Sequence, residues 1–401
     1  MTMQMFTGKQ YLKIDIANNF GLDQEDWDVR LKWFDDNEHQ LDKLIKQAEE
    51  PALFFAGIQA WKKTLKGEPS AYPISLDATA SGIQLLACMT GDRKAARLCN
   101  VVDTGHREDA YTGLYTSMIE KLGDTAKIDR KGTKQAIMTA FYSSTAVPKR
   151  IFGDGPLLDT FYETMKEGAP GAWELTEAFL SIWDETKYSY NWVMPDNYHV
   201  KIKVMKTVSE NVHFLNEPFE VQYSVNEPIE KGRSLGANAN HSVDGMLVRE
   251  MVRRCMYDPN HVENLMHWIN EDAYTKRTDR PKDKMVLTLW DHYMDSGFIS
   301  ARILDYLDRE NIGLTRPGVI RFLLESLPVK PFEVITVHDC FRCLPNYGND
   351  LRFQYNVLLA EIAQSNILSF LMSQMLGRIV KVDKIDPNLY KDILESNYAL
   401  S

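Results

Sequence analysis

The chain has 401 residues, of which 44% are hydrophobic, 11% aromatic and 25% charged. This composition is that of a folded globular protein and excludes extensive disorder, and the length exceeds what one hydrophobic core usually supports. The formal net charge of -10 excludes a protein that coats nucleic acid non-specifically, although it does not exclude a local basic cleft.

The N-terminal sequence MTMQMFTGKQYLKIDIANN lacks the charged start, apolar middle and small-residue cleavage site of a secretion signal. No run of about 18 apolar residues occurs, so no membrane span is expected. The five cysteines are an odd number, which suits a reducing compartment better than a disulfide framework. We therefore expect a soluble, intracellular protein.

The first half of the chain is predicted to be mainly helical. Residues 23–50 place apolar side chains at helical spacing among acids and lysines, which predicts an amphipathic scaffold helix. Residues 74–76 predict a short buried strand, followed by a turn of small residues and an apolar helix that ends near Gly91. From about residue 105 to residue 180 the pattern is again helical.

The second half of the chain mixes strands and helices. Residues 198–225 alternate with a period of two, which predicts strands or a hairpin. A run of small residues from Gly236 leads to His241 and then to a predicted helix. Residues 256–330 are predicted to be helical and polar, whereas residues 334–343 predict two short strands, the first buried, on either side of a break.

Two aspartates stand at the ends of predicted buried strands. Asp77 follows the strand at 74–76, and Asp339 follows the apolar run that ends at Val337. A carboxylate in such a place is costly unless its charge is compensated. Each aspartate alone is explained by a capped turn. Together, carboxylates from two strands can hold a pair of magnesium ions that clamp the attacking and leaving oxygens in phosphoryl transfer.

The stretch DRKGTKQAIMTAFYS places Arg130, Lys134, Met138 and Tyr142 at intervals of four residues. On a helix these side chains share one broad face. The arginine and lysine can grip neighbouring phosphates, and the methionine and tyrosine offer a flat surface for stacking a base. The alternative is an ordinary surface helix with an apolar opposite side.

Three motifs occur in one order along the chain: DATASGIQ around Asp77, RKGTKQAIMTAFY at 130–142 and HDCF at 338–341. This combination resembles the single-subunit RNA polymerases of bacteriophages and mitochondria. The segments LKIDIAN, DAYTGLY, ANHSVDG and the tail DILESNYALS also look like parts of those enzymes. The resemblance therefore runs nearly end to end, with a gap at 256–330.

The resemblance implies a right-hand polymerase palm and fingers, mainly helical and of the α+β class, with an antiparallel palm sheet. Residues 1–104 and 242–401 would form the two parts of the palm, residues 105–241 the fingers, and residues from about 256 to 330 a helical insertion. The thumb and the N-terminal domain are expected to be absent.

The resemblance also assigns roles to single residues. Asp77 and Asp339 would bind two Mg²⁺ ions, and with Lys134 and Tyr142 they would form the catalytic set. His241 and Tyr111 would touch the DNA template or the RNA transcript. The residues that would bind the nucleoside triphosphate are Lys13, Gly82, Arg130, Lys134, Met138 and Tyr142.

The chain departs from those polymerases in three places. Ser143 stands where they have glycine, and Cys340 stands where they have serine, but neither change removes a metal ligand. Their Asp/Thr-x-x-Gly-Arg motif, promoter-binding region and thumb have no counterpart before Lys13. We therefore expect a second polypeptide to supply these parts. The chain resembles the larger chain of the two-chain RNA polymerases of enquatrovirus-type phages, which predicts the cytoplasm of an infected bacterium as its location.

Two other functions stay open at this point. A DNA polymerase of the bacterial repair type shares the palm aspartates and the Arg, Lys, Tyr helix, but it usually carries a Glu shortly after the first Asp. This chain has Gly82 and no acid in that turn, which favours ribonucleotides. The second alternative is an inactive palm that acts as an assembly or DNA-loading factor. Residues 198–225 occupy the place of the phage enzymes' promoter-reading hairpin, and whether they read sequence is open.

Overall fold

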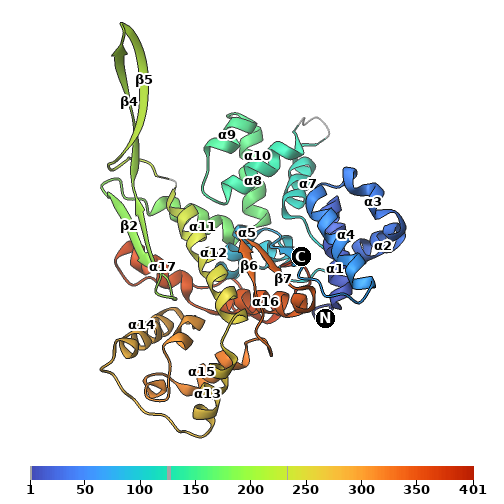
Figure 1. Ribbon diagram of the computed structural model, residues 1–401. Helices are drawn as coiled ribbons and strands as arrows, with labels where there is room; N and C mark the ends of the chain where they lie inside the picture. Colours follow the sequence, from blue (N-terminus) through green and yellow to red (C-terminus); the bar gives the residue numbers. More distant parts are fainter. Residues whose placement is uncertain (1, 124–127, 233) are drawn as a thin grey trace.

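The computed structural model describes residues 2–123, 128–232 and 234–401, and helices predominate in it over small antiparallel sheets (Figure 1). The expectation of a mainly helical α+β fold is therefore confirmed. Within these three ranges no helix combines the length and the apolar character needed to cross a membrane.

A group of helices precedes the first strand: α1 (Gly8–Ala17), α2 (Trp27–Asn37), α3 (Leu41–Leu44) and α4 (Pro51–Leu65). The single helix expected over 23–50 is wrong, because α2 ends at Asn37 and short 3₁₀ segments flank α3. The side-chain amide of Asn37 donates to the carbonyl of Trp33 at 2.8 Å, a local bond that competes with continuation of the helix.

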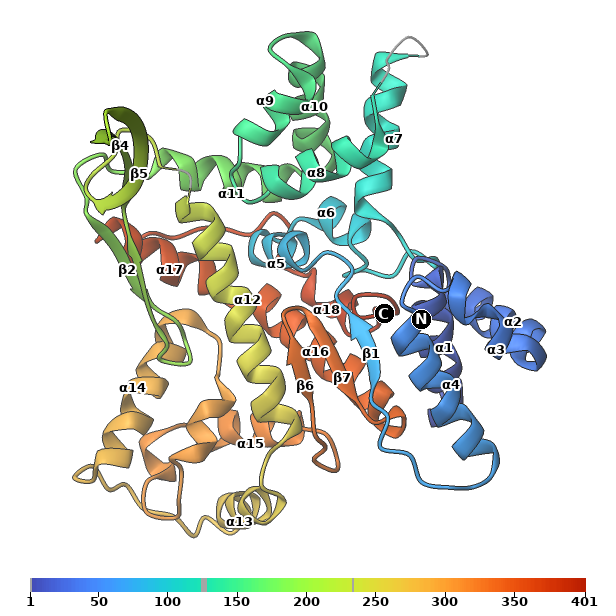
Figure 2. The ribbon, with the colours of Figure 1, turned by 45° about the horizontal axis from the view of Figure 1, so that its top comes forward.

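The central sheet has three antiparallel strands in the order β1 (Ile74–Asp77), β7 (Cys340–Cys343), β6 (Ile335–Val337) (Figure 2). Its register places Asp77 opposite Cys340 and Cys340 opposite Val337. One face of the sheet is buried and the other is open. The expectation that β6 is buried is wrong: it is an edge strand, and its residues Ile335 and Val337 are 54% and 51% exposed on the open face.

The buried face of the sheet belongs to the main hydrophobic core, which also contains α5 (Ser81–Thr90), α12 (Ser234–Cys255) and α16 (Gly348–Gln364). Gln84 of α5 links several of these parts, because its amide donates to the carbonyls of Cys99 and Ala399 and its oxygen accepts from Tyr355. The tail reaches the end of β1, where the amide nitrogen of Ser401 donates to the carbonyl of Asp77 at 2.9 Å.

A helical lobe follows α5 and lies to one side of the sheet in Figure 2. Its helices are α6 (Arg93–Leu98), α7 (Ala110–Leu122), α8 (Arg130–Ala140), α9 (Ala146–Phe152), α10 (Pro156–Gly168) and α11 (Pro170–Ser181). The helical pattern predicted from about 105 to 180 is therefore confirmed.

Two hairpins come next, and the alternation at 198–225 predicts their last three strands but not the first, which lies at 189–193. They are β2 (Ser189–Val193) with β3 (His199–Lys203), and β4 (Met205–Phe214) with β5 (Glu217–Asn226). The β4–β5 hairpin projects away from the rest of the molecule (Figure 1). After it, α12 begins at Ser234 rather than beyond His241, so His241 lies within the helix and not in a preceding turn.

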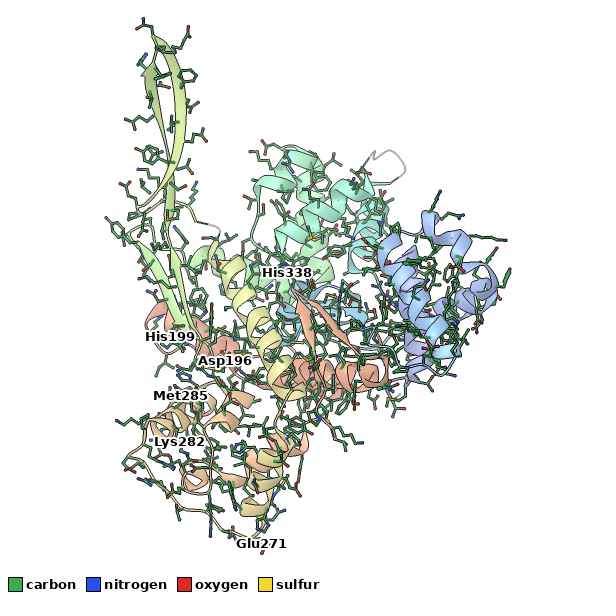
Figure 3. All side chains as sticks on the ribbon, in the orientation of Figure 1. Asp196, His199, Glu271, Lys282, Met285 and His338 are labelled. Carbon is green, nitrogen blue, oxygen red and sulfur yellow. The ribbon has the colours of Figure 1, made fainter. Side chains whose placement is uncertain are left out.

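Residues between α12 and β6 build a second hydrophobic core of their own. Its helices are α13 (Pro259–Asn270), α14 (Pro281–Ser296) and α15 (Pro317–Glu325), and the chain ends with α17 (Ile367–Leu376) and α18 (Tyr390–Ile393) after α16. Buried Asp196 pairs with Arg249 and Arg253 of α12, and Arg302 donates to its carbonyl. Figure 3 shows Asp196 near Met285, where this unit meets the β2–β3 turn.

Candidate functional site

Asp77 and Asp339 lie at the same end of the central sheet. Asp77 is the last residue of β1, and Asp339 lies in the turn between β6 and β7. The amide nitrogen of Ala78 donates to the carbonyl of Asp339 at 3.1 Å, which fixes the two segments against each other. His338, at the tip of this turn in Figure 3, has a φ of 56°. The structure thus brings the two predicted aspartates together.

The carboxyl group of Asp77 is affected by burial and by its neighbours. Burial raises the pKa of Asp77, the thiol of Cys340 opposes this by donating a hydrogen bond to the carboxylate, and the negative charge of Asp339 raises the pKa further. In the three described ranges no lysine or arginine forms an ion pair with either carboxylate. The negative charge at this end of the sheet is therefore offset only in part, by the positive charge of Arg342 acting on Asp77, and this favours a bound cation.

The carboxylate oxygens of Asp77 and Asp339 fit a hard cation that also binds ligands from outside the protein. The part of the chain that the structure describes holds no group of three or more His, Cys, Asp or Glu residues that could bind a metal ion. The carboxylates at this end of the sheet that would be available to a metal are those of Asp77 and Asp339. Mg²⁺ is commonly bound in this way, with waters and substrate phosphates completing its coordination.

The predicted cationic helix forms as α8. Asp129 caps it by accepting from the amide nitrogen of Gly132 at 2.7 Å, and Ala136 and Ile137 lie on its buried face. Arg130 and Lys134 lie on its accessible face. An ordinary surface helix would also have an apolar face opposite to its cations. The helix alone therefore does not distinguish a phosphate-binding role from a structural one.

Arg130 and Lys134 of α8 contact the start of α7. The guanidinium of Arg130 donates to the carboxylate of Asp109 at 2.8 Å and to the hydroxyl of Thr112 at 2.6 Å. The ammonium of Lys134 lies 5.2 Å from the centre of the Tyr111 ring. Tyr111 therefore lies among the predicted site residues, packed under a cation.

Tyr142 joins three parts of the site just after α8. Its ring centre lies 4.7 Å from that of His241 on α12. A Cβ atom at Gly82 would lie 2.3 Å from its phenolic oxygen, so this contact requires glycine. Burial, followed by the charges of Asp244 and Asp339, raises the pKa of Tyr142 to about 12. Met138, one turn earlier, is exposed.

Lys13 contacts other residues than those of the site around Asp77 and Tyr142. Its ammonium pairs with Asp35 at 2.5 Å and lies 5.3 and 5.4 Å from the ring centres of Phe34 and Trp61. These partners belong to α2 and α4. Its neighbour Asp15 instead accepts from the amide nitrogen of Ser75 at 2.7 Å, so α1 contacts β1 through another side chain.

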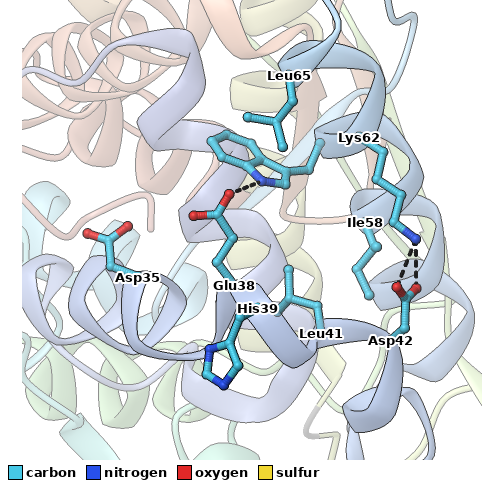
Figure 4. Close-up of a pocket in the computed structure, with 9 residues that line it drawn as sticks. Asp35, Glu38, His39, Leu41, Asp42, Ile58, Lys62 and Leu65 are labelled. Atoms are coloured by element: carbon cyan, nitrogen blue, oxygen red, sulfur yellow. Dashed lines mark hydrogen bonds and ion pairs between the residues drawn. The ribbon is translucent and has the colours of Figure 1, made fainter.

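A hollow of about 450 Å³ lies beside Lys13, between α2, α3 and α4 (Figure 4). Two polar contacts hold its walls: the indole nitrogen of Trp61 donates to Glu38 at 2.8 Å, and Lys62 pairs with Asp42 at 2.8 Å. None of the predicted site residues lines it. Its acids already have partners, since Asp35 pairs with Lys13, Asp42 with Lys62, and Glu38 accepts from Trp61, so we do not assign it a function.

Two polar residues of the site are missed by the sequence analysis. Asp244 lies on α12 three residues after His241, and burial together with the charge of Asp339 raises its pKa to about 6. Arg342 lies on the open face of β7, in the register between Ser75 and Ile335. The helical spacing from His241 and the strand alternation after Asp339 are the signals that could have identified them.

Part of this site lies in a range of the chain that matches a known family. Residues 6–155 match the family model described as DNA-dependent RNA polymerase. This range contains Asp77, Gly82, Tyr111 and α8, whereas His241 and Asp339 lie beyond it.

Three curated relatives show the extent of the similarity. A probable DNA-directed RNA polymerase of Neurospora crassa is 29% identical over 34% of this chain and 18% of its own length. The mitochondrial DNA-directed RNA polymerase of Schizosaccharomyces pombe is 25% identical over 36% of this chain and 15% of its own. That of Pseudomonas phage phiKMV is 25% identical over 34% of this chain and 21% of its own. The matches thus span about a fifth or less of each relative.

The relatives contradict the predicted location. Some of the relatives carry a compartment in their names. Those of Schizosaccharomyces pombe and Neurospora crassa are mitochondrial, and that of Arabidopsis thaliana is chloroplastic and mitochondrial. The expectation of an infected bacterium's cytoplasm is therefore wrong, because it rested on the phage members of the resemblance alone. Through residues 6–155, which carry Asp77 and the cationic helix α8, this chain is similar to the DNA-dependent RNA polymerases of mitochondria and phages.

Proposed function

We propose that this chain carries the nucleotide-adding site of a DNA-dependent RNA polymerase, which uses nucleoside triphosphates, a DNA template and a growing RNA transcript. The observation that supports this most is the meeting of Asp77 and Asp339 at one end of the sheet, beside the end of α8. The residue types there are those that two-metal nucleotidyl transfer needs.

Arg130 and Lys134 bind the phosphates of the incoming nucleotide in this proposal. In the structure Arg130 pairs with Asp109, and Lys134 lies over the Tyr111 ring. The side chains of Arg130 and Asp109 are 45% and 22% exposed, so a phosphate can reach Arg130 and replace Asp109 as its partner. An arginine can hold two phosphate oxygens as a fork, and a lysine one turn away adds a point charge. Met138 and Tyr142 stack against the base, and the Tyr142 hydroxyl on Gly82 lies where it can sense the sugar.

Asp77 and Asp339 would hold two Mg²⁺ ions, and when bound these ions neutralise charge on the attacking hydroxyl and on the leaving pyrophosphate. The hydrogen bonds from Ser401 and Ala78 fix the backbone at Asp77 and at Asp339. The thiol of Cys340 orients the Asp77 carboxylate, in the place of the serine found in the polymerases that the chain resembles.

The domain roles follow the same proposal. Residues 1–104 and 242–401 form the palm, residues 105–241 form the fingers, and the helical unit within 256–330 is an insertion with its own core. A second polypeptide that supplies the Gly-Arg motif, the thumb and the promoter region stays a prediction, which co-purification of the chain from its natural source would test.

Primer extension tests the proposed activity. The full chain, with any co-purifying subunit, is given a primed DNA template, Mg²⁺ and either ribonucleotides or deoxyribonucleotides. We expect ribonucleotide addition that falls by at least about 1,000-fold in Asp77→Asn and in Asp339→Asn. The matched control is Glu333→Gln, which removes an exposed acid two residues before β6 and is expected to leave the rate unchanged.

The two alternative functions give other results. A strong preference for deoxyribonucleotides would favour a DNA polymerase, although the Tyr142 hydroxyl packed on Gly82 leaves no room for an acid at that position. Unchanged function in both aspartate variants would favour an inactive palm that acts in assembly.

A further inference from the structure

The β4–β5 hairpin is a long ribbon, and among the elements that the structure describes none packs along its outer half (Figure 1). Each strand has ten residues, which corresponds to a length of about 33 Å. Leu215 and Asn216 form the two-residue turn at the tip, with φ of 51° and 64°. Figures 1 and 3 show the ribbon and its side chains extending into solvent.

The register gives the hairpin two different faces. Paired residues share a face, so Val212 and Phe219 lie together, as do Val208 and Tyr223. One face, here called the apolar face, consists of Val208, Val212, Phe214, Phe219, Val221, Tyr223 and Val225 with Lys206, Glu210 and Glu217. The opposite face is polar apart from Met205 and Pro218.

Much of the apolar face is open to solvent. Phe214 and Phe219 are 65% and 52% exposed. Cross-strand pairs such as Val212 with Phe219 help to hold the two strands together, but they leave much of this apolar surface in contact with water. At the tip, Leu215 is 82% exposed in a backbone conformation that large side chains rarely adopt. Exposed apolar surface of this kind marks an interaction site.

The charges on the hairpin indicate which kind of molecule can bind it. Glu210, Glu217 and Glu220 are negative, whereas Lys206 is neutralised by its ion pair with Glu227 at 3.3 Å. An acidic ribbon repels the phosphates of nucleic acid. It also repels a second copy of itself, since the same acids would face each other. An apolar surface edged with lysine or arginine is complementary to it.

We propose that the apolar face of the β4–β5 hairpin docks a different protein, whose contact surface is apolar and bordered by basic side chains. The proposal stands on the pairing register, exposure and charge of the hairpin and does not depend on the polymerase activity. It assigns the hairpin a protein partner in place of the promoter-reading role that the resemblance suggests for this position.

Site-specific photo-crosslinking tests the proposal in the full chain, made in its natural cells. The cross-linking residue benzoylphenylalanine replaces Phe219 on the apolar face or, as the matched control, Gln222 on the polar face. We expect one defined protein adduct from position 219 and none from position 222. Adducts to nucleic acid, adducts to a second copy of this chain, or equal labelling from both positions would overturn the proposal.

A binding measurement with the purified adduct protein completes the test. Phe219→Ser and Glu217→Lys are each expected to weaken its binding to the full chain by about 10-fold or more, whereas Gln222→Ala leaves it unchanged. Circular dichroism of each variant checks the fold, which these exposed positions should not disturb. Wild-type affinity in both Phe219→Ser and Glu217→Lys would overturn the proposal.

Discussion

Ser143 occupies a backbone conformation that favours glycine. Its φ is 66°, its side chain is buried, and its hydroxyl oxygen has no hydrogen-bond partner among the residues that the structure describes. The polymerases that the chain resembles carry glycine at this place. A left-handed conformation costs a residue with a Cβ about 1–2 kcal/mol, and an unsatisfied buried hydroxyl adds about 1–3 kcal/mol.

Replacing Ser143 by glycine should therefore stabilise the protein. After subtracting the greater freedom that glycine gives the unfolded chain, we expect the free energy of unfolding to rise by about 1 kcal/mol. Urea unfolding measures this difference. Ser144→Gly is the control, because Ser144 has no positive φ and should gain nothing; equal stability of Ser143→Gly and wild type would contradict the explanation.

Asp15 is a buried carboxylate with three hydrogen bonds. It accepts from the amide nitrogen of Ser75, the hydroxyl of Tyr72 and the amide of Asn19. Burial outweighs these bonds and raises its pKa from 3.8 to about 6. Because the folded state then binds more protons than the unfolded state between these two values, the free energy of unfolding falls as the pH rises through them.

The pH dependence of stability should reflect this group. Between about pH 4 and pH 6 we expect the free energy of unfolding of wild type to fall by about 2–3 kcal/mol because of Asp15. Asp244 should lower it further. Asp15→Asn cannot titrate, so its unfolding midpoint should fall less steeply over the same range. A slope as steep in Asp15→Asn as in wild type would show that another group is responsible.

At the scale of elements, α8 is the part of the site that the sequence predicts best. Its cap, its buried face and its accessible cations all follow from spacings of three and four residues. The contacts of Arg130 with Asp109 and of Lys134 with Tyr111 could not be predicted in this way, because they depend on how α7 packs on α8. The same holds for Lys13, whose partners lie on α2 and α4.

Lys134 and Lys131 provide a matched pair on α8. We expect Lys134→Ala to lower kcat/KM for the nucleotide by about 100-fold, because a charged contact to phosphate is lost, and Lys131→Ala to change it by less than about threefold. Steady-state primer extension over a range of nucleotide concentrations measures both. Similar losses in the two variants would indicate a general effect of positive charge instead of a defined phosphate contact.

The wrong predictions for β6 and for the residues before His241 have a common physical cause. The apolar residues of β6 predict burial, but the strand forms the edge of a sheet whose other face is open. The small residues before His241 predict a turn, but they are accommodated within α12, where Gly236 allows close packing against Ser143. In both cases tertiary packing decides what local composition leaves undetermined.

For the whole molecule, the meeting of Asp77 with Asp339 is the feature that no local pattern predicts. It depends on β7 pairing with β1 across most of the chain and on the tail closing beside them. The sequence predicts it only through the order of the three polymerase-like motifs. The second core between α12 and β6 shows that the chain also carries a unit with separate packing, whose existence the polar helical pattern indicates.

The central claim is that Asp77 and Asp339 hold divalent ions jointly. The most direct measurement is Mn²⁺ binding to the full chain, followed by electron paramagnetic resonance with a non-hydrolysable ribonucleotide present. We predict that Asp77→Asn and Asp339→Asn each weaken binding by about 10-fold or more. The double variant should bind little worse than either, since the jointly held ions are lost in all three. Wild-type Mn²⁺ affinity in either single variant would contradict the claim.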